Sequence, residues 1–282
     1  MKNLLLVLFC FLAAISCSSN KTEQNQEQPT VSPQAEVPTE QPSQPQAESK
    51  LFSGPIKSFQ IMHIDGIKDL KKRLKKVDVV TLELDQVTKE IGDYLESVNV
   101  KLICYTSVGY ENWREDAAQY PAEAKGGKIK CTPFSGGCPA VGYWKGEEWG
   151  NTTKQSLIDF MAKRYDQAKD KECKGVENDN VDQAFNKPSF KITKAQNIEA
   201  NIKLAKEINK RGMFAVMKNG VEMSKELAPY YQGVFIEECN ANEECDDYLP
   251  YKGKIVAIKE YGEDCFESNW SACQEADDYF ED

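Results

Sequence analysis

Histidine is nearly absent from the chain, with His63 as its only representative. A Ser-His-Asp or Cys-His arrangement therefore has little to draw on, and a helical H-E-x-x-H zinc motif is impossible. The cysteines also lack the C-x₂-C spacing that is typical of a zinc site. We therefore expect neither a metal nor a cofactor, and acid-base chemistry must fall to carboxylates.

The chain also lacks a Lys/Arg-rich run of the kind that follows a nucleic-acid backbone. It has 35 Lys and Arg residues against 45 Asp and Glu residues, which gives a formal net charge of -10. We expect no nucleic-acid partner, and we expect a monomer. An acidic surface attracts a cationic ligand, although charge of this kind also serves ordinary solubility.

An apolar stretch near the N-terminus is too short to span a bilayer. Lys2 precedes it, and it covers residues 4–15. This arrangement predicts a signal peptide at residues 1–16. The tetrad Ala14-Ile15-Ser16-Cys17 is similar to a bacterial lipobox, in which Cys17 becomes the lipidated first residue. A plain secretory signal with a stray thiol is the alternative.

Residues 17–50 continue with Gln, Glu, Pro, Ser and Thr and almost no apolar residue. Such a segment buries too little apolar surface to offset the entropy lost on folding, so we expect it to be disordered. Residues 17–50 are therefore predicted to be a lipidated Cys followed by a disordered tether. The chain is then an exported bacterial lipoprotein, anchored through its lipid at the outer membrane or the cell surface. Residues 51–282 remain for one folded domain.

Ten cysteines occur in the chain, and eight remain when Cys10 in the signal and Cys17 at the anchor are set aside. An even number suits an oxidising compartment and disulfides. Proximity in the sequence suggests one of many possible connectivities, with these pairs: Cys131 with Cys138, Cys239 with Cys245, Cys265 with Cys273, and the remaining Cys104 with Cys173.

Short apolar runs rich in β-branched residues alternate with amphipathic helical stretches in the folded region. The predicted strands are residues 59–64, 77–84, 101–105, 175–177, 213–217, 233–236 and 254–258, and the predicted helices include 67–76, 153–171 and 193–211. This alternation predicts an α/β fold with a parallel sheet. A TIM-like (β/α)₈ barrel fits better than an open doubly wound sheet, because no Gly-rich phosphate fingerprint follows a strand. Only residues 279–280 remain for an eighth strand, so the barrel is expected to be irregular there.

Polar side chains gather where the predicted strands end, which is the edge that carries the active site in such barrels. They are Glu83, Asp85, Tyr105, Ser107, Glu177, Asp179, Asn180, Asp182, Lys218, Asn219, Glu237, Glu238, Glu260 and Tyr261, and Gly109 also follows the third strand. Two carboxylates across a cleft are what glycosidic cleavage needs. Asp179 and Glu237, after the fourth and sixth strands, are the natural catalytic pair.

Residues 177–182 also permit two simpler interpretations, a calcium loop or a solvated polar loop. The spacing fits an EF-hand poorly, since Val181 occupies the fifth position and Asp182 the sixth, where glycine is required. Both alternatives stay open from the residues alone.

Aromatic residues near the strand ends supply flat faces on which sugar rings stack. They are Tyr105, Tyr110, Trp113, Trp144, Trp149 and Tyr261. Core packing explains any one of them, whereas their grouping beside carboxylates favours a ligand site.

Several motifs together resemble glycoside hydrolase family 114, the endo-α-1,4-polygalactosaminidases, from about residue 59 to about residue 273. They are the runs at residues 103–109, 111–116, 144–149 and 173–182, Lys218-Asn219, and Glu237-Glu238-Cys239 with Cys245. The resemblance implies a TIM-like barrel with Asp179 as nucleophile and Glu237 as acid/base of a retaining mechanism. It also implies a disulfide between Cys104 and Cys173.

The resemblance further implies a cationic amino-sugar polysaccharide as the substrate. Substrate-binding residues expected on this basis and from the strand ends are Glu83, Asp85, Tyr105, Ser107, Trp113, Arg114, Trp149, Glu177, Asn180, Asp182, Lys218, Asn219, Glu260 and Tyr261. The sequence departs from the family pattern at Asn178, Asn151 and residues 83–86, which bears on linkage or sugar preference. A non-catalytic glycan-binding lipoprotein and a hydrolase of another α-linked glycan remain as alternatives.

Overall fold

Seven parallel strands form the centre of the computed structural model, which describes residues 56–130 and 143–260. Each strand hydrogen-bonds to its neighbours in sequence order, always in parallel register. The strands are β1 (Phe59–Met62), β2 (Val79–Glu83), β3 (Lys101–Ser107), β7 (Gly175–Asp179), β8 (Phe214–Lys218), β9 (Gly233–Glu237) and β10 (Ile255–Lys259). A doubly wound sheet reverses its strand order, whereas a barrel adds strands one after another as here.

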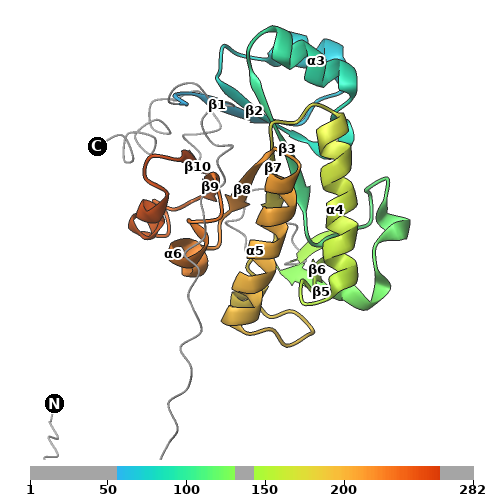
Figure 1. The fold of residues 1–282 in the computed structure, drawn as a ribbon, viewed down its shortest axis with the longest axis vertical. Coiled ribbons are helices and arrows are strands. Elements are labelled where there is room, and N and C mark those ends of the chain that lie inside the picture. Colours follow the sequence, from blue (N-terminus) through green and yellow to red (C-terminus); the bar gives the residue numbers. More distant parts are fainter. Residues whose placement is uncertain (1–55, 131–142, 261–282) are drawn as a thin grey trace, which may run out of the picture. The chain divides into compact units, whose positions relative to one another are not determined.

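The sheet curves until it is nearly closed into a barrel (Figure 1). The ring of Phe59 on β1 lies 5.9 Å from the ring of Phe235 on β9, centroid to centroid, so strands far apart in the order meet inside. A separate buried cluster fills this interior with Val79, Ile103, Val216, Phe235 and Ala257. The predicted TIM-like barrel is confirmed, and the segment at residues 279–280 lies outside the described residues.

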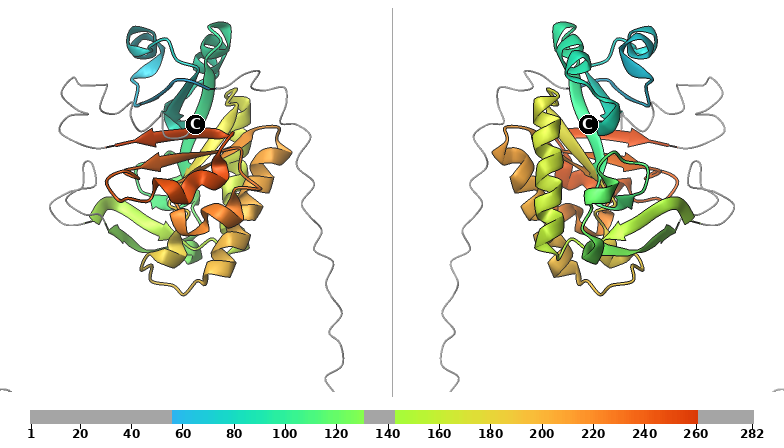
Figure 2. Two further views of the ribbon diagram at one scale, coloured as in Figure 1. Left: turned by 90° about the vertical axis from the view of Figure 1, so that its left-hand side faces the viewer. Right: turned by 90° about the vertical axis from the view of Figure 1, so that its right-hand side faces the viewer.

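Helices connect the strands, and three of them confirm predicted ones with slightly shorter bounds: α2 (Gly66–Arg73), α4 (Gln155–Asp170) and α5 (Lys194–Lys210). Thr193 begins α5 with a capping box, because its hydroxyl accepts from Gln196 N while the Gln196 side chain accepts from Thr193 N. The helix α3 (Lys89–Ser97) was not predicted, and the Thr88 hydroxyl caps it. Figure 2 shows the helices from two sides.

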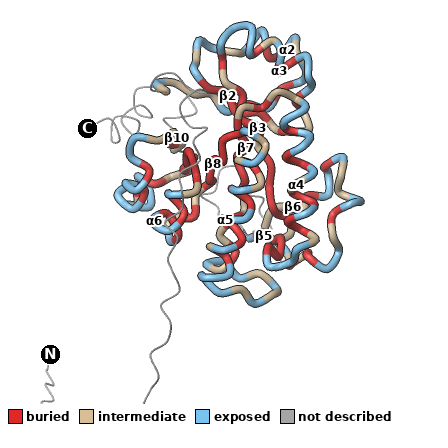
Figure 3. Tube along the Cα trace, viewed as in Figure 1, coloured by how far each residue is buried: buried red, intermediate tan, exposed pale blue. Residues whose placement is uncertain are grey.

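The connections after β8 and β9 are reduced to short pieces, α6 (Ser224–Leu227) and a 3₁₀ segment η6 (Cys245–Tyr251). The barrel is therefore less regular towards its C-terminal strands. Figure 3 shows burial running most continuously along the strands. Over the ranges that the structure describes, every helix is too short or too polar to cross a membrane.

A small antiparallel sheet interrupts the barrel between β3 and α4. It consists of β4 (Tyr110–Glu111), β5 (Lys125–Lys130) and β6 (Tyr143–Gly150), in the order β4-β6-β5. No strand was predicted between residues 105 and 153, because lysines, glycines and glutamates break the apolar alternation that marks a strand. This sheet carries residues 144–149 to the barrel's carboxyl end.

Two of the four predicted disulfides join described cysteines, and both form: Cys104 with Cys173, and Cys239 with Cys245. The first bond joins β3 to the residues leading into β7 across a sequence separation of 69. It therefore closes the whole excursion that contains the small sheet and α4. The pairs Cys131 with Cys138 and Cys265 with Cys273 lie outside the described residues.

Removing the bond between Cys104 and Cys173 is expected to cost more stability than removing the other described disulfide. All four cysteines are buried, so alanine leaves similar voids at both sites. The long loop contributes about 4 kcal/mol of closure entropy and the short one about 2 kcal/mol. Denaturant unfolding of Cys104→Ala/Cys173→Ala beside Cys239→Ala/Cys245→Ala measures the difference. An equal or smaller loss for the first pair would contradict the expectation.

Candidate active site

A cavity of about 770 Å³ opens at the carboxyl ends of the barrel strands. Six strands each place a polar side chain in its wall: Glu83 on β2, Tyr105 on β3, Asp179 on β7, Lys218 on β8, Glu237 on β9 and Lys259 on β10. Because side chains alternate along a strand, these residues continue the inward-facing rows that are apolar at the other end of the barrel. The interior thus changes from apolar to ionic along the strands.

Acidic groups dominate the wall of this cavity. Ten carboxylates line it: Glu83, Glu111, Glu147, Glu177, Asp179, Asp182, Glu222, Glu237, Glu238 and Glu244. Lys130, Lys218 and Lys259 are the lysines among the lining residues. Because acidic side chains outnumber the lysines in this concave wall, we expect a negative potential in the cavity that attracts cations.

Hydrogen bonds hold the carboxylate of Asp179 at the end of β7. The hydroxyl of Tyr105 donates to its Oδ2 at 2.7 Å, and the backbone N–H of Asn180 donates to its Oδ1 at 2.7 Å. Both oxygens are engaged, while the side chain stays 24% exposed. Asp179 is therefore oriented and still accessible from the cavity.

Three strands that carry site residues end in a left-handed residue. Asn180, Asn219 and Glu238 follow β7, β8 and β9 directly, with φ of 57°, 50° and 60°. This conformation is disfavoured for residues other than glycine, and such strain is typical of functional sites. The side-chain oxygen of Asn219 also accepts from the backbone N–H of Glu237 at 2.8 Å, which fixes two strand ends against each other.

Lys218 lies among three carboxylates. Its Nζ is 3.1 Å from Glu237 Oε2, 3.9 Å from Asp179 Oδ2 and 4.0 Å from Glu177 Oε1. Because Lys218 Nζ lies 3.1 Å from Glu237 Oε2 and 3.9 Å from Asp179 Oδ2, these two oxygens can be at most about 7 Å apart. Lys218 thus holds the predicted catalytic pair within reach of one sugar linkage.

Glu177 lies at the base of the cavity and is 1% exposed. Its Oε2 has no hydrogen-bond partner among the described residues. Burial raises the pKa of this carboxyl to about 8, and Lys218 only partly opposes that shift. Burial therefore favours the neutral form of Glu177.

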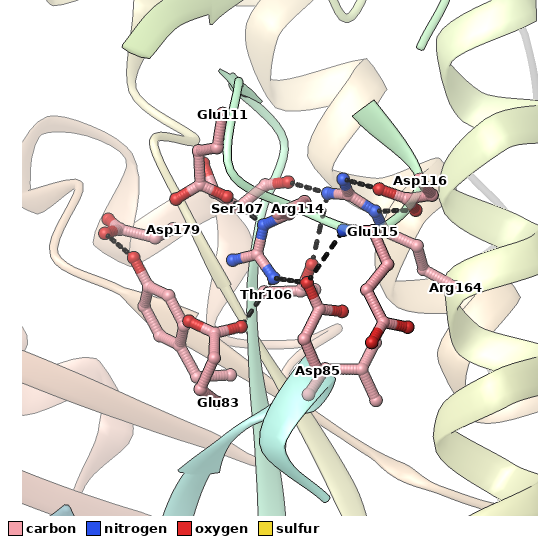
Figure 4. A network of polar contacts seen from close by, with 12 residues as sticks. Glu83, Asp85, Thr106, Ser107, Glu111, Arg114, Glu115, Asp116, Arg164 and Asp179 are labelled. Atoms are coloured by element: carbon pink, nitrogen blue, oxygen red, sulfur yellow. Dashed lines mark hydrogen bonds and ion pairs between the residues drawn. The ribbon is translucent and has the colours of Figure 1, made fainter. Parts of the chain in front are cut away.

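Arg114 anchors the small sheet to the barrel, because it pairs with Glu111 on the sheet and Glu83 on the barrel (Figure 4). Its side chain is 1% exposed and donates to Glu111 on β4 and to Glu83 on β2. Burial raises the pKa of Glu111 to about 7, against the influence of Arg114. Burial also raises the pKa of Glu83. Nη2 of Arg114 has no hydrogen-bond partner in the described part of the chain.

The small sheet adds a second carboxylate beside Glu111. Glu147 on β6 is its partner in the antiparallel register and lines the cavity. Burial, followed by the charges of Glu111 and Asp179, raises the pKa of Glu147 to about 8. The excursion therefore contributes acid groups close to Asp179, not only a cover for the barrel.

Aromatic side chains form part of the same wall, namely Tyr105, Trp113, Trp144 and Trp149. Trp113 is 53% exposed, which is unusual for so large an apolar surface, whereas Trp149 is 5% exposed. Tyr110 packs against Tyr120 instead, with ring centroids 5.4 Å apart. Trp113 therefore offers a ring face to a ligand, and Tyr110 follows the core-packing alternative.

The cavity gathers most of the predicted site residues but not all of them. It brings together Asp179, Glu237, Glu83, Tyr105, Trp113, Trp149, Glu177, Asn180, Asp182, Lys218 and Asn219. Asp85, Ser107, Arg114 and Glu260 are not among its lining residues. Arg114 is covered by Glu83 and Glu111, and the Ser107 hydroxyl bonds Asn180 and Gly109. Tyr261 lies outside the described residues.

Other lining residues were not predicted as site residues, including Glu111, Glu147 and Lys259. Lys259 could have been found, because it follows Ile255 and Ala257 in the alternation of β10. Glu111 and Glu147 reach the cavity because β4 pairs with β6, and no local sequence pattern predicts that pairing.

Two departures from the family pattern lie away from the cavity wall. The amide of Asn178 donates to Tyr165 Oη on α4 at 2.8 Å, on the outer side of β7. Asn151 accepts from the hydroxyl of Thr153 at 2.7 Å just before α4. Neither lines the cavity, whereas Glu83, from the third departure, does.

Within residues 56–130 and 143–260, no group of three His, Cys, Asp or Glu side chains has an arrangement that could hold a metal ion. The acidic side chains of the cavity are instead spread around its wall, and five of the ten are paired with Lys218 or Arg114.

The raised carboxyl pKa values predict that the protein loses stability as pH rises from about 5 to 8. Burial above all raises them, to about 6 for Asp182, about 7 for Glu111 and about 8 for Glu147 and Glu177. Unfolded carboxyls titrate near pH 4, so in this window the folded chain binds more protons than the unfolded chain. Its stability is then complete below about pH 4 and falls as each folded pKa is passed.

Thermal unfolding checks this expectation, with a Tm roughly 5 °C higher at pH 5.5 than at pH 8. Glu177→Gln should show a smaller difference, because its amide keeps the neutral form at both values. A Tm that is constant or that rises with pH would count against the raised pKa values.

Comparison with known proteins shows which family the chain belongs to. The sequence profile described as glycoside-hydrolase family GH114 matches residues 39–280. Among curated proteins none matches the chain. Solved structures with a similar fold include Ega3 of Aspergillus fumigatus in complex with galactosamine, with a TM-score of 0.64 and 28% sequence identity over 73% of this chain and 78% of Ega3.

The glycoside hydrolase domain of PelA from Pseudomonas aeruginosa is also similar, with a TM-score of 0.55 and 16% identity over 75% of this chain and 87% of that domain. At that identity the likeness shows the fold alone. The profile match extends over most of the sequence and includes every residue of the cavity described above. The chain therefore belongs to glycoside hydrolase family GH114 and is a glycosidase.

Proposed function

We propose that this protein hydrolyses an α-1,4-linked polygalactosamine-type polymer, with Asp179 and Glu237 as its catalytic carboxylates. The observation that carries the proposal is the acidic cavity wall, in which that pair belongs to a set of ten Asp and Glu side chains. A polymer with free amines is cationic near neutral pH, so the wall concentrates it and provides acceptors for its ammonium groups. The galactosamine bound to the related Ega3 supports the same class of sugar.

Asp179 is suited to the role of nucleophile. The hydroxyl of Tyr105 and the backbone N–H of Asn180 orient its carboxylate, and Lys218 supplies a positive charge 3.9 Å from Oδ2. Glu237 approaches the same space from β9 and serves as acid/base. It protonates the leaving oxygen and then takes a proton from the incoming water.

The spacing of the two carboxylates favours retention of anomeric configuration. Retaining glycosidases keep the pair about 5–5.5 Å apart and inverting enzymes about 6.5–9.5 Å. The upper bound of about 7 Å set by Lys218 covers the retaining range and only the lower end of the inverting one. Two successive displacements at the anomeric carbon, the first by Asp179 and the second by water, then give a product of retained configuration.

The protein acts outside the cytoplasm under this proposal, tethered through a lipid on Cys17. The lipobox-like tetrad at residues 14–17 and the polar segment that follows support this location. A tether of this composition leaves the cavity free to meet a polymer at the membrane surface.

Product release tests the proposed function directly. The full chain is incubated with partially deacetylated α-1,4-galactosaminogalactan beside Asp179→Asn and Glu237→Gln, and released oligomers are measured by mass spectrometry. Oligomers from the wild type alone are expected. Binding without release would favour a non-catalytic glycan-binding protein, and release from another α-linked glycan alone would replace the substrate.

A further inference from the structure

A second group of acidic side chains lies in the cavity on loops that do not carry the catalytic pair. Glu222 belongs to a 3₁₀ turn after β8, Val221–Met223, and Glu244 precedes η6. Asp182 follows β7 and connects this group to the catalytic centre, since the charges of both Asp179 and Glu222 raise its pKa after the larger effect of burial. All three line the cavity.

The three carboxylates lie close enough to influence one another and a tyrosine. Burial raises the pKa of Glu244, and the charge of Glu222 raises it further. Burial also raises the pKa of Tyr248, and the charges of Glu244, Glu222 and Asp182 follow as causes. The charges of all three carboxylates therefore act on Tyr248, whose segment η6 contacts the turn that carries Glu222.

The hydroxyl of Tyr248 is a buried polar group that lacks a protein partner. Tyr248 is 0% exposed and lines the cavity. Its hydroxyl oxygen has no hydrogen-bond partner among residues 56–130 and 143–260. A buried hydroxyl without a partner costs free energy, so a group bound in the cavity is the natural partner for it.

The loops that carry these side chains are held in place covalently and conformationally. The disulfide between Cys239 and Cys245 closes the segment that includes Glu244. Gly220 has a φ of 78°, a left-handed conformation that turns the chain directly before Glu222. The cluster is therefore built before any ligand arrives, which lowers the ordering cost of binding.

We propose that Glu222, Glu244 and Tyr248 form a second cation subsite, which binds the ammonium group of a sugar residue other than the one at Asp179. An ammonium has three donors and no acceptor, and two carboxylates with a hydroxyl oxygen can accept all three. This inference rests on the proposed function, because it assigns a further amine of the same polymer. The second subsite would let the protein bind two sugar residues of one polymer chain at the same time.

Binding in a catalytically inactive background tests the subsite. The probe is a fully deacetylated α-1,4-galactosamine oligomer, titrated by calorimetry into the full chain carrying Asp179→Asn. Adding Glu222→Gln and Glu244→Gln is expected to raise Kd about tenfold, and adding Tyr248→Phe about threefold, as lost charged and neutral hydrogen bonds would. The matched control is Glu243→Gln, an exposed neighbour on the same loop, which should change Kd less than twofold.

Hydrolysis by the otherwise wild-type chain separates the two proposals. Glu222→Gln/Glu244→Gln should raise KM about tenfold and change kcat much less, because the subsite contacts the chain away from the bond that breaks. If the wild type cleaves the oligomer but the double variant keeps its Kd and KM, the subsite is overturned and the function stands. If the wild type neither binds nor cleaves it, both are overturned.

Discussion

Replacing Asp179 by asparagine is expected to lower kcat on an amino-sugar oligomer about ten-thousand-fold, which corresponds to about 5.5 kcal/mol of transition-state stabilisation. The amide has nearly the same shape and can still accept the hydrogen bond from Tyr105, so the site should remain assembled. It cannot attack the anomeric carbon. Steady-state kinetics with an unchanged Tm would show that chemistry and not folding has been lost.

The control for this change is Asp159→Asn. Asp159 is an exposed residue on α4 that does not line the cavity. It should leave kcat unchanged. Glu237→Gln supplies a second comparison, since an acid/base variant keeps much of its first-step rate on a substrate with a good leaving group such as fluoride. Asp179→Asn keeps none of it. Equal rates for Asp179→Asn and the wild type would remove Asp179 from the mechanism.

Replacing Arg114 by methionine is expected to destabilise the protein by about 3–5 kcal/mol at pH 8. The change leaves the buried Glu111 and the partly buried Glu83 without their shared cation, and it releases β4 from the end of β2. Arg114→Lys should recover only part of the loss, because one ammonium cannot reproduce the forked contacts of a guanidinium. Denaturant unfolding measures the loss.

At pH 5 the same substitution should cost less, because neutral carboxyls need no cation. Burial already raises the pKa of Glu111 to about 7 with Arg114 present, and the loss of the arginine raises it further. The matched control is Lys203→Met, which breaks an exposed pair with Glu199 on α5 and should cost less than about 1 kcal/mol. An Arg114→Met cost as small as that of the control would show that the network is not structural.

The barrel and much of its polar end could be predicted from sequence because both depend on local patterns. Runs such as residues 101–105 and 213–217 are apolar enough to be recognised as buried strands, and parallel strands bring their carboxyl ends to one edge. That reasoning correctly predicted that Asp179, Lys218 and Glu237 lie together. The same reasoning chose Asp179 and Glu237 as the catalytic pair, and the family resemblance implied the same two residues.

The rest depends on contacts that local patterns do not encode. The strands β5 and β6 contain lysines and glycines, so the small sheet and the pairing of Glu111 with Glu147 escaped prediction. Arginine is a common substrate ligand, so Arg114 was predicted to bind substrate. Its side chain is instead buried and donates hydrogen bonds to Glu83 and Glu111. Tyr248 lines the cavity because of the way η6 folds, and no sequence pattern around Tyr248 predicts that position.

The measurement that tests the central claim most directly is mass spectrometry of a trapped glycosyl-enzyme. The full chain carrying Glu237→Gln is mixed with α-galactosaminyl fluoride, which needs no acid to leave but whose enzyme adduct needs the missing base to be hydrolysed. We predict a galactosaminyl ester on the peptide that contains Asp179, absent from the same chain with Asp179→Asn. Turnover of the wild type with an adduct on another residue, or with no adduct at all, would contradict Asp179 as the nucleophile.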